Sequence, residues 1–131
     1  MVSMGTLATL LSSVLDHART SFTNPCLWVP TGAGVFAVVV SGLLGIIDKP
    51  SRGDLIIYSL TMVLLIVVGI TGLVLHIQQN LTAGGLVIQE RFIRGVPFLA
   101  PMLFANMGAL GLITLLDPTE RGTEKNNAGM A

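Results

Sequence analysis

Apolar residues of this chain gather into three long runs that short polar segments separate. The middle run covers residues 55–77 and contains no Asp, Glu, Lys or Arg. A helix of this length rises roughly 34 Å, enough to cross a bilayer core of about 30 Å, and it satisfies its own backbone hydrogen bonds within lipid. Ser51 stands three residues before Asp54, the spacing of a helix capping box. The pattern therefore predicts a transmembrane helix over 55–77.

The other two runs also match membrane-spanning helices. Residues 29–47 carry Pro30 in the opening turn, where the missing N–H costs nothing. Residues 96–116 carry Pro101 near their start, and this proline is predicted to kink or loosen the first turns. The sequence thus predicts an all-α membrane protein with three transmembrane helices at 29–47, 55–77 and 96–116. The short polar turn at 48–54 should join the first two as an antiparallel hairpin.

The segment before the first span has a weaker apolar pattern. Its apolar residues recur at helical spacing: Met4, Leu7, Leu11, Val14 and Leu15. This stretch is too short to span, so we expect an amphipathic helix that lies in the membrane interface or packs on a partner, with Trp28 as an interfacial anchor. It has no basic residue ahead of its apolar part and no A-x-A pattern, so we do not expect a cleaved signal peptide.

These patterns divide the chain into three parts. Residues 1–28 form the N-terminal interfacial helix and anchor, and residues 29–116 form the three-helix transmembrane domain. Residues 117–131 form a polar tail, which we expect to be disordered until a partner binds. Three basic residues on one predicted side of the membrane against four on the other leave the orientation open.

Composition narrows the classes of function. Charged residues make up 11% of the 131 residues and mean hydropathy is +0.80, so most apolar surface must face lipid or protein. A net charge of zero and few aromatic residues argue against nucleic acid as a partner. The single cysteine, Cys26, excludes an internal disulfide. No catalytic or phosphate-binding motif is present, so we expect no enzyme activity and no metal site.

Small residues at regular spacing indicate where helices pack, because helices in lipid associate through close contact. The first span carries Ala33, Ala37, Ser41 and Gly45, each four residues apart. The second carries Gly69 and Gly72, and the third carries Gly108. A chain this small has little interior of its own, so we expect these surfaces to pack against other subunits.

Asn106 lies close to the middle of the third span and is the one strongly polar side chain well inside a span. An unpaired amide there is costly, so we expect it to hydrogen-bond to another helix. The alternative is a contact to a ligand such as a quinone carbonyl. A single amide without ionisable neighbours makes no proton relay, and this favours the interhelical bond.

Two histidines offer a cofactor alternative, and the topology places both on the same side of the membrane. Neutral imidazole can bind haem iron or chlorophyll magnesium, and Gly72 one turn before His76 would leave room for a ring. Arg91 and Arg94 lie on the same side and could line a quinone site. The simpler interpretation is a histidine at a helix C-terminus and basic residues against lipid phosphates, and we expect no bound cofactor.

Together these patterns predict a non-catalytic accessory subunit of a larger, bioenergetic membrane complex. Its expected partners are the lipid bilayer and other membrane subunits, and its expected location is the bacterial plasma membrane. The alternative is the membrane anchor of a redox enzyme, with a haem, pigment or quinone near His76. The lack of charged residues inside the spans weighs against ion pumps and transporters of charged substrates.

Overall fold

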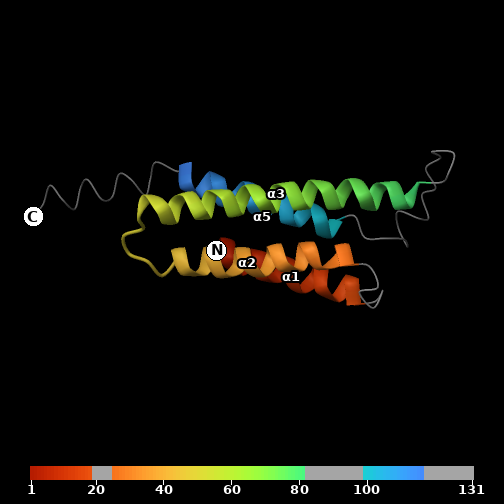
Figure 1. The fold of residues 1–131 in the computed structure, drawn as a ribbon, viewed down its shortest axis with the longest axis horizontal. Coiled ribbons are helices and arrows are strands. Elements are labelled where there is room, and N and C mark those ends of the chain that lie inside the picture. Colours follow the sequence, from red (N-terminus) through yellow and green to blue (C-terminus); the bar gives the residue numbers. More distant parts are fainter. Residues whose placement is uncertain (19–24, 82–98, 117–131) are drawn as a thin grey trace, which may run out of the picture.

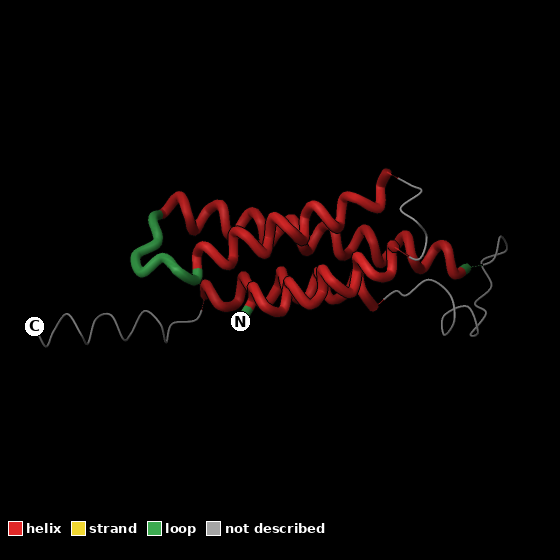
Figure 2. The backbone as a smooth tube through the Cα atoms, turned by 90° about the horizontal axis from the view of Figure 1, so that it is seen from below, coloured by secondary structure: helices red, strands yellow, loops and turns green. Residues whose placement is uncertain are grey.

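A computed structural model of the chain describes residues 1–18, 25–81 and 99–116. These residues form helices that run side by side in an elongated bundle, and successive long helices are antiparallel (Figure 1). The elements are α1 (Val2–Ala18), the short 3-10 helix η1 (Pro25–Leu27), α2 (Trp28–Leu44), α3 (Arg52–Asn80) and α5 (Leu99–Leu116). A second view, at a right angle to the first, shows the same bundle with the turn at 45–51 at one end (Figure 2).

Three of these helices are long and apolar enough to cross a membrane, which confirms the predicted number. They are Pro25–Leu44, Arg52–Asn80 and Leu99–Leu116. The second is longer than the predicted 55–77 at both ends, and α2 ends at Leu44 rather than at residue 47. The predicted start of the third span, residues 96–98, lies outside the described residues. Pro101 lies near the start of the described part of α5, and the kink predicted there stays a prediction because the preceding residues lie outside the described range.

The turn between α2 and α3 is closed by the predicted capping box. The hydroxyl oxygen of Ser51 accepts a hydrogen bond from the backbone N–H of Asp54 at 3.2 Å, and the Ser51 N–H donates to an Asp54 carboxylate oxygen at 2.8 Å. This pair satisfies two backbone donors at the start of α3. The cap fixes where α3 begins and lets it return antiparallel to α2, as the sequence predicted.

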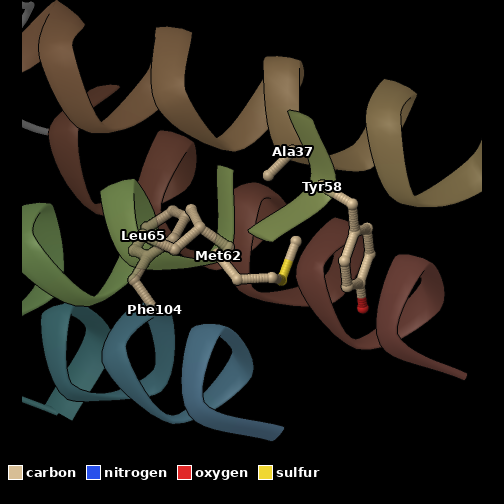
Figure 3. Packing of buried hydrophobic residues seen from close by; sticks show 5 residues of the cluster. All are labelled: Ala37, Tyr58, Met62, Leu65 and Phe104. Atoms are coloured by element: carbon tan, nitrogen blue, oxygen red, sulfur yellow. The ribbon is translucent and has the colours of Figure 1, made fainter. Parts of the chain in front are cut away.

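The core lies where α2, α3 and α5 meet. Ala37 from α2 faces Tyr58, Met62 and Leu65 from α3, with Phe104 from α5 (Figure 3). Between 22% and 28% of the apolar stretch in each spanning helix is buried, so most of each helix faces outward. An outward surface this apolar is typical of a helix that faces lipid or another membrane protein.

Helices α3 and α5 approach each other at backbone distance. A methyl group added at Gly69 would lie 2.5 Å from the backbone nitrogen of Ala105 and 2.6 Å from the carbonyl oxygen of Pro101. A methyl group added at Gly108 would lie 2.5 Å from the carbonyl oxygen of Met62. These glycines permit the contact because any side chain would collide with backbone atoms, which cannot rotate away. The two glycines therefore set the separation of α3 and α5.

Helix α1 lies along the bundle instead of across its end, and this differs from the predicted interfacial helix. Leu10 approaches α2 at Gly34, where an added methyl group would lie 2.8 Å from the leucine side chain, and Gly5 faces Met107 of α5. The two contacts lie about a turn and a half apart along α1 and reach two different helices. We therefore describe α1 as a fourth helix of the bundle.

The face that α1 turns inward is largely polar. Thr6, Thr9 and Ser13 are buried, whereas Leu11 and Leu15 are exposed. The Thr6 hydroxyl donates to the carbonyl of Val2 at 2.8 Å, and the Thr9 hydroxyl donates to that of Gly5 at 2.9 Å. Because these hydroxyls are satisfied by the preceding turn of their own helix, they can be buried without a partner on another helix. Polar residues inside and apolar residues outside suit a helix packed in a membrane bundle.

Candidate functional site

The small residues predicted to pack helices are mostly covered by the chain's own helices. Ala33, Ala37 and Ser41 of α2 are buried, and the Ser41 hydroxyl donates to the carbonyl of Ala37 at 2.6 Å. Gly45 is the exposed C-cap of α2 and lies outside this contact. Together with Gly69 and Gly108, these positions show that the chain has an interior of its own. The sequence analysis expected these small residues to pack against other subunits. Because they already pack against helices of the same chain, they are no evidence for such a partner.

Gly72 does not provide space for a cofactor ring. A methyl group added there would lie 3.0 Å from the Cβ atom of Pro101, so α5 already occupies the side of α3 that Gly72 opens. A macrocycle that approached His76 along this face would displace α5. The glycine serves the contact between helices, and a cofactor at His76 would have to enter from the end of the bundle.

Asn106 faces away from the bundle. It lies near the middle of α5 (Leu99–Leu116), and its side chain is exposed. Within the described part of the chain no residue forms a hydrogen bond with its carboxamide. The predicted bond to another helix is therefore not made among the described residues. The reason is the rotation of α5, which the close contact at Gly108 fixes, because Gly108 lies about 200° around the helix from Asn106.

Asn106 belongs to a continuous outward face of α5. The face is formed by Leu99, Leu103, Asn106, Leu110 and Ile113, all of them exposed. We call these five residues the α5 outer face. Their spacings of 4, 3, 4 and 3 keep them on one side of the helix, opposite the buried Phe104, Gly108 and Gly111. The amide thus stands at the centre of an apolar strip, with two large apolar residues on each side of it.

The α5 outer face is suited to contact with another helix. A carboxamide has two N–H donors and one carbonyl acceptor, and hydrocarbon offers a partner to none of them. Leaving such a group without hydrogen bonds in an apolar medium costs about 2 to 7 kcal/mol. The leucines and the isoleucine can pack against a second helix while the amide bonds to a polar group on it. The α5 outer face thus combines apolar packing residues with one group that needs a hydrogen-bond partner.

A second group of candidate residues lies at one end of the bundle, where α1 and α3 end. His17 and His76 contact each other edge to face, with ring centroids 6.4 Å apart and ring planes at 87°. The sequence predicted that both histidines lie on the same side of the membrane, and the structure brings them together at one end of the bundle. It also shows direct contact, which the sequence did not predict because α1 was not expected along the bundle.

The environment of His17 disfavours its protonated form. Burial lowers the pKa of the imidazole, the neighbouring His76 lowers it further, and the carboxylate of Asp16 opposes both effects. Its Nδ1 atom lies 3.3 Å from the hydroxyl oxygen of Ser13, one turn earlier on α1. The neutral ring is therefore favoured, and neutral imidazole is the form that binds a metal.

The histidine pair does not extend to a metal site within the described residues, where no group of three or more His, Cys, Asp or Glu side chains is close enough to hold an ion. Cys26 is exposed in η1. Arg91 and Arg94, predicted to line a quinone site, lie outside the described residues, as does the polar tail at 117–131.

The structure adds Thr31 of α2, whose buried hydroxyl oxygen has no hydrogen-bond partner within the described ranges. No pattern in the sequence singled out this residue.

Comparison of the chain with models of known protein families, with curated protein sequences and with solved structures gives no match. The functional argument therefore depends on the geometry of the α5 outer face and of the histidine pair.

Proposed function

We propose that this chain is a non-catalytic subunit of a larger integral-membrane assembly, and that it contacts another membrane helix through the α5 outer face. The observation that supports the proposal is the exposed carboxamide of Asn106 near the middle of α5. The amide is exposed in the middle of a spanning helix, and it forms no hydrogen bond within the described part of the chain. A neighbouring membrane protein could supply the missing hydrogen bonds.

The same features argue against transport as the main function. The helices α2 and α5 contain no Asp, Glu, Lys or Arg, and α3 contains such residues only at Arg52 and Asp54 in its first turn. Pumps and transporters of charged substrates place ionisable residues within their spans. A chain that lacks them is better suited to bind and hold other membrane proteins.

Affinity purification of the tagged chain in a mild detergent tests the proposal. We expect partners at fixed stoichiometry by mass spectrometry, and we expect Asn106→Leu to reduce their recovery. Val67→Leu is the matched control, because Val67 is exposed on the outer side of α3 and carries no polar group. Recovery of a single copy of the chain with no partner would contradict the proposal, as would equal recovery from the Asn106 variant.

The second candidate function is the membrane anchor of a redox enzyme. The contact between His17 and His76 favours it, because two imidazoles at one end of a bundle can bind a haem, a chlorophyll or the head group of a quinone. Such a group would approach from the end of the bundle, since Pro101 covers Gly72. A visible absorption band that shifts or disappears with His76→Ala would support this function. A colourless preparation with unchanged quinone-dependent turnover in its partners would contradict it.

The bacterial plasma membrane is the location that we propose for the assembly. Three apolar helices of this length suit an α-helical bilayer protein, and fractionation of cells that express the tagged chain tests the choice. We expect the chain in the plasma-membrane fraction, extracted by detergent and not by high salt. Recovery in another membrane would contradict the location without affecting the proposed contact at α5.

A further inference from the structure

We infer that the helix that covers the α5 outer face belongs to a second copy of this chain, so that two copies form a parallel dimer with Asn106 at its centre. This inference rests on the proposed function, which assigns the α5 outer face to contact with a membrane protein. It goes further by naming the partner, and three properties of the surface support a second copy.

The first property is symmetry. Two copies inserted in the same orientation can be related by a two-fold axis along the membrane normal. If that axis passes beside α5, the two α5 helices run parallel and equivalent residues lie at equal depth. Asn106 of one copy then faces Asn106 of the other. A different partner would need its own polar group at the same depth, whereas a second copy supplies one by symmetry.

The second property is the chemistry of the amide. Asn106 carries both an N–H donor group and a carbonyl acceptor on one short side chain. Two such groups across a two-fold axis can bond reciprocally, since each amide donates to the carbonyl of the other. A carboxylate or an ammonium could not pair with itself in this way. The polar group at the centre of the α5 outer face is therefore self-complementary.

The third property is the shape of the surface. The residues Leu99, Leu103, Leu110 and Ile113 flank Asn106 at spacings of 4 and 3, the pattern of the seam in parallel coiled coils. In parallel coiled coils a single asparagine at an a position specifies the register and the number of strands at some cost in stability. Asn106, three residues after Leu103 and four before Leu110, stands at a d position, the other seam position. Large side chains above and below Asn106 would exclude competing polar groups from the amide pair.

The outer side of α3 provides a comparison within the same molecule. Its residues Ile56, Leu60, Val63, Val67, Ile70 and Val74 are exposed at the same spacings. All six are apolar and need no hydrogen-bond partner, so lipid tails can cover this surface as favourably as another protein can. The spacing of exposed residues is thus common to both helices, and the central amide distinguishes α5.

Disulfide cross-linking in membranes tests the parallel dimer. In a chain with Cys26→Ser as background, Leu103→Cys and Leu110→Cys place one thiol on each side of Asn106, and Val67→Cys is the control on α3. Each α5 variant should form a disulfide-linked species of two copies on mild oxidation. The control should stay monomeric, and mixed Leu103→Cys and Leu110→Cys chains should not cross-link to each other, since that pair would require antiparallel helices.

Co-purification of two differently tagged copies measures the contribution of the amide. Asn106→Leu should lower the association constant about threefold to thirtyfold, the range that one interhelical hydrogen bond provides in a membrane. Asn106→Gln should retain more association than Asn106→Leu, because it keeps the amide. Dimers that are unaffected by both changes and lack the cross-links at α5 would overturn the inference.

The outcomes separate this inference from the proposed function. Cross-links from Leu103→Cys to a different membrane protein, with no linked pair of copies, would overturn the dimer and leave the proposed contact at α5 supported. Absence of any cross-link from α5, with a monodisperse single copy in detergent, would overturn both. Cross-links between copies alone would support both, with the dimer as the assembly.

Discussion

The two faces of α5 use neighbouring residues for different purposes. Gly108 lies on the inner face, where an added methyl group would meet the carbonyl of Met62, and Asn106 lies two residues earlier on the exposed face. The inner face contains small residues that let two helices of one chain touch. The outer face contains large apolar residues around the Asn106 carboxamide, which forms no hydrogen bond with another described residue. The small residue Gly108 thus serves a contact within this chain, whereas the outward Asn106 is the basis of the contact that we propose with another protein.

The outer sides of α3 and α5 differ in one respect. Both present large apolar residues at the same spacing, and only α5 has a carboxamide at the centre of the strip. Apolar exposure by itself does not distinguish lipid from protein as the neighbour. The amide does, because lipid tails cannot accept or donate its hydrogen bonds. The following predictions test this contrast between faces.

The largest expected effect is on the free energy of unfolding, and it comes from a substitution on the inner face of α5. Gly108→Ala should reduce the free energy of unfolding by about 1 to 3 kcal/mol, because the new methyl group meets backbone and α3 must move away. Unfolding in mixed detergent micelles measures the change. Gly32→Ala is the matched control, since nothing lies within 4 Å of the added methyl group there. Equal stability of the two variants would show that α3 and α5 do not pack as described.

The contrast between α3 and α5 can be reversed by moving the amide. Val67→Asn in an Asn106→Leu background should transfer self-association from α5 to the outer side of α3, with a contribution of about 0.6 to 2 kcal/mol to dimer stability. Disulfide cross-linking at Leu60→Cys on α3 and at Leu103→Cys on α5 reports the transfer. Continued cross-linking only at α5 would show that the shape of that face, and not its amide, selects the partner.

A change at the cap of α3 should affect folding and leave both faces of α5 intact. Ser51→Ala removes one side of the capping box and should destabilise the bundle by about 1 kcal/mol. The association constant should stay at its wild-type value once folding is complete. A parallel loss of association would indicate that dimer formation depends on overall stability, and the effect of Asn106→Leu would then need correction for unfolding.

The smallest effect concerns pH. Burial and the proximity of His76 lower the folded-state pKa of His17 from its ordinary value of 6.5, so the unfolded chain binds the proton more tightly. Stability should be fully present above about pH 6.5 and should fall as the pH drops through that value towards the folded-state pKa. His17→Gln should flatten this dependence in unfolding measured from pH 5 to 8. A profile unchanged by the substitution would contradict the role of His17.

Much of the fold follows from the sequence because its signals are local. The charge-free runs predicted three spanning helices, and Ser51 with Asp54 predicted the start of α3. Tyr58, Met62 and Leu65 recur at spacings of 4 and 3, which puts them on one face of a helix, and this face is buried in the core (Figure 3). Each of these signals depends on one helix and its caps, so none required knowledge of how the helices assemble.

The placement of α1 could not be predicted in the same way. Its leucines suggested an apolar face that lies against the membrane, and two of them, Leu11 and Leu15, are exposed on the bundle. The sequence did not show that Thr6, Thr9 and Ser13 would turn into the bundle, because their hydroxyls can be satisfied locally and leave no pattern of partners. The contact of His17 with His76 depends on this placement and was missed for the same reason.

The direction of Asn106 depends on how α5 is rotated against α3. One feature of the sequence could have predicted it, since Gly108 was expected to pack against a helix and lies on the opposite side of α5 from Asn106. If Gly108 faces the bundle, then Asn106 faces away from it. The two residues were interpreted separately, and the expectation that small residues contact other subunits came from the small size of the chain.

The mass of the purified chain in mild detergent, with bound detergent subtracted, tests the central claim most directly. The chain has a mass of 13.8 kDa. We predict a wild-type particle of at least twice this mass, and a shift of Asn106→Leu towards the single-chain mass at the same concentration. A wild-type particle of 13.8 kDa that the substitution leaves unchanged would contradict the assignment of the α5 outer face as a contact between membrane proteins.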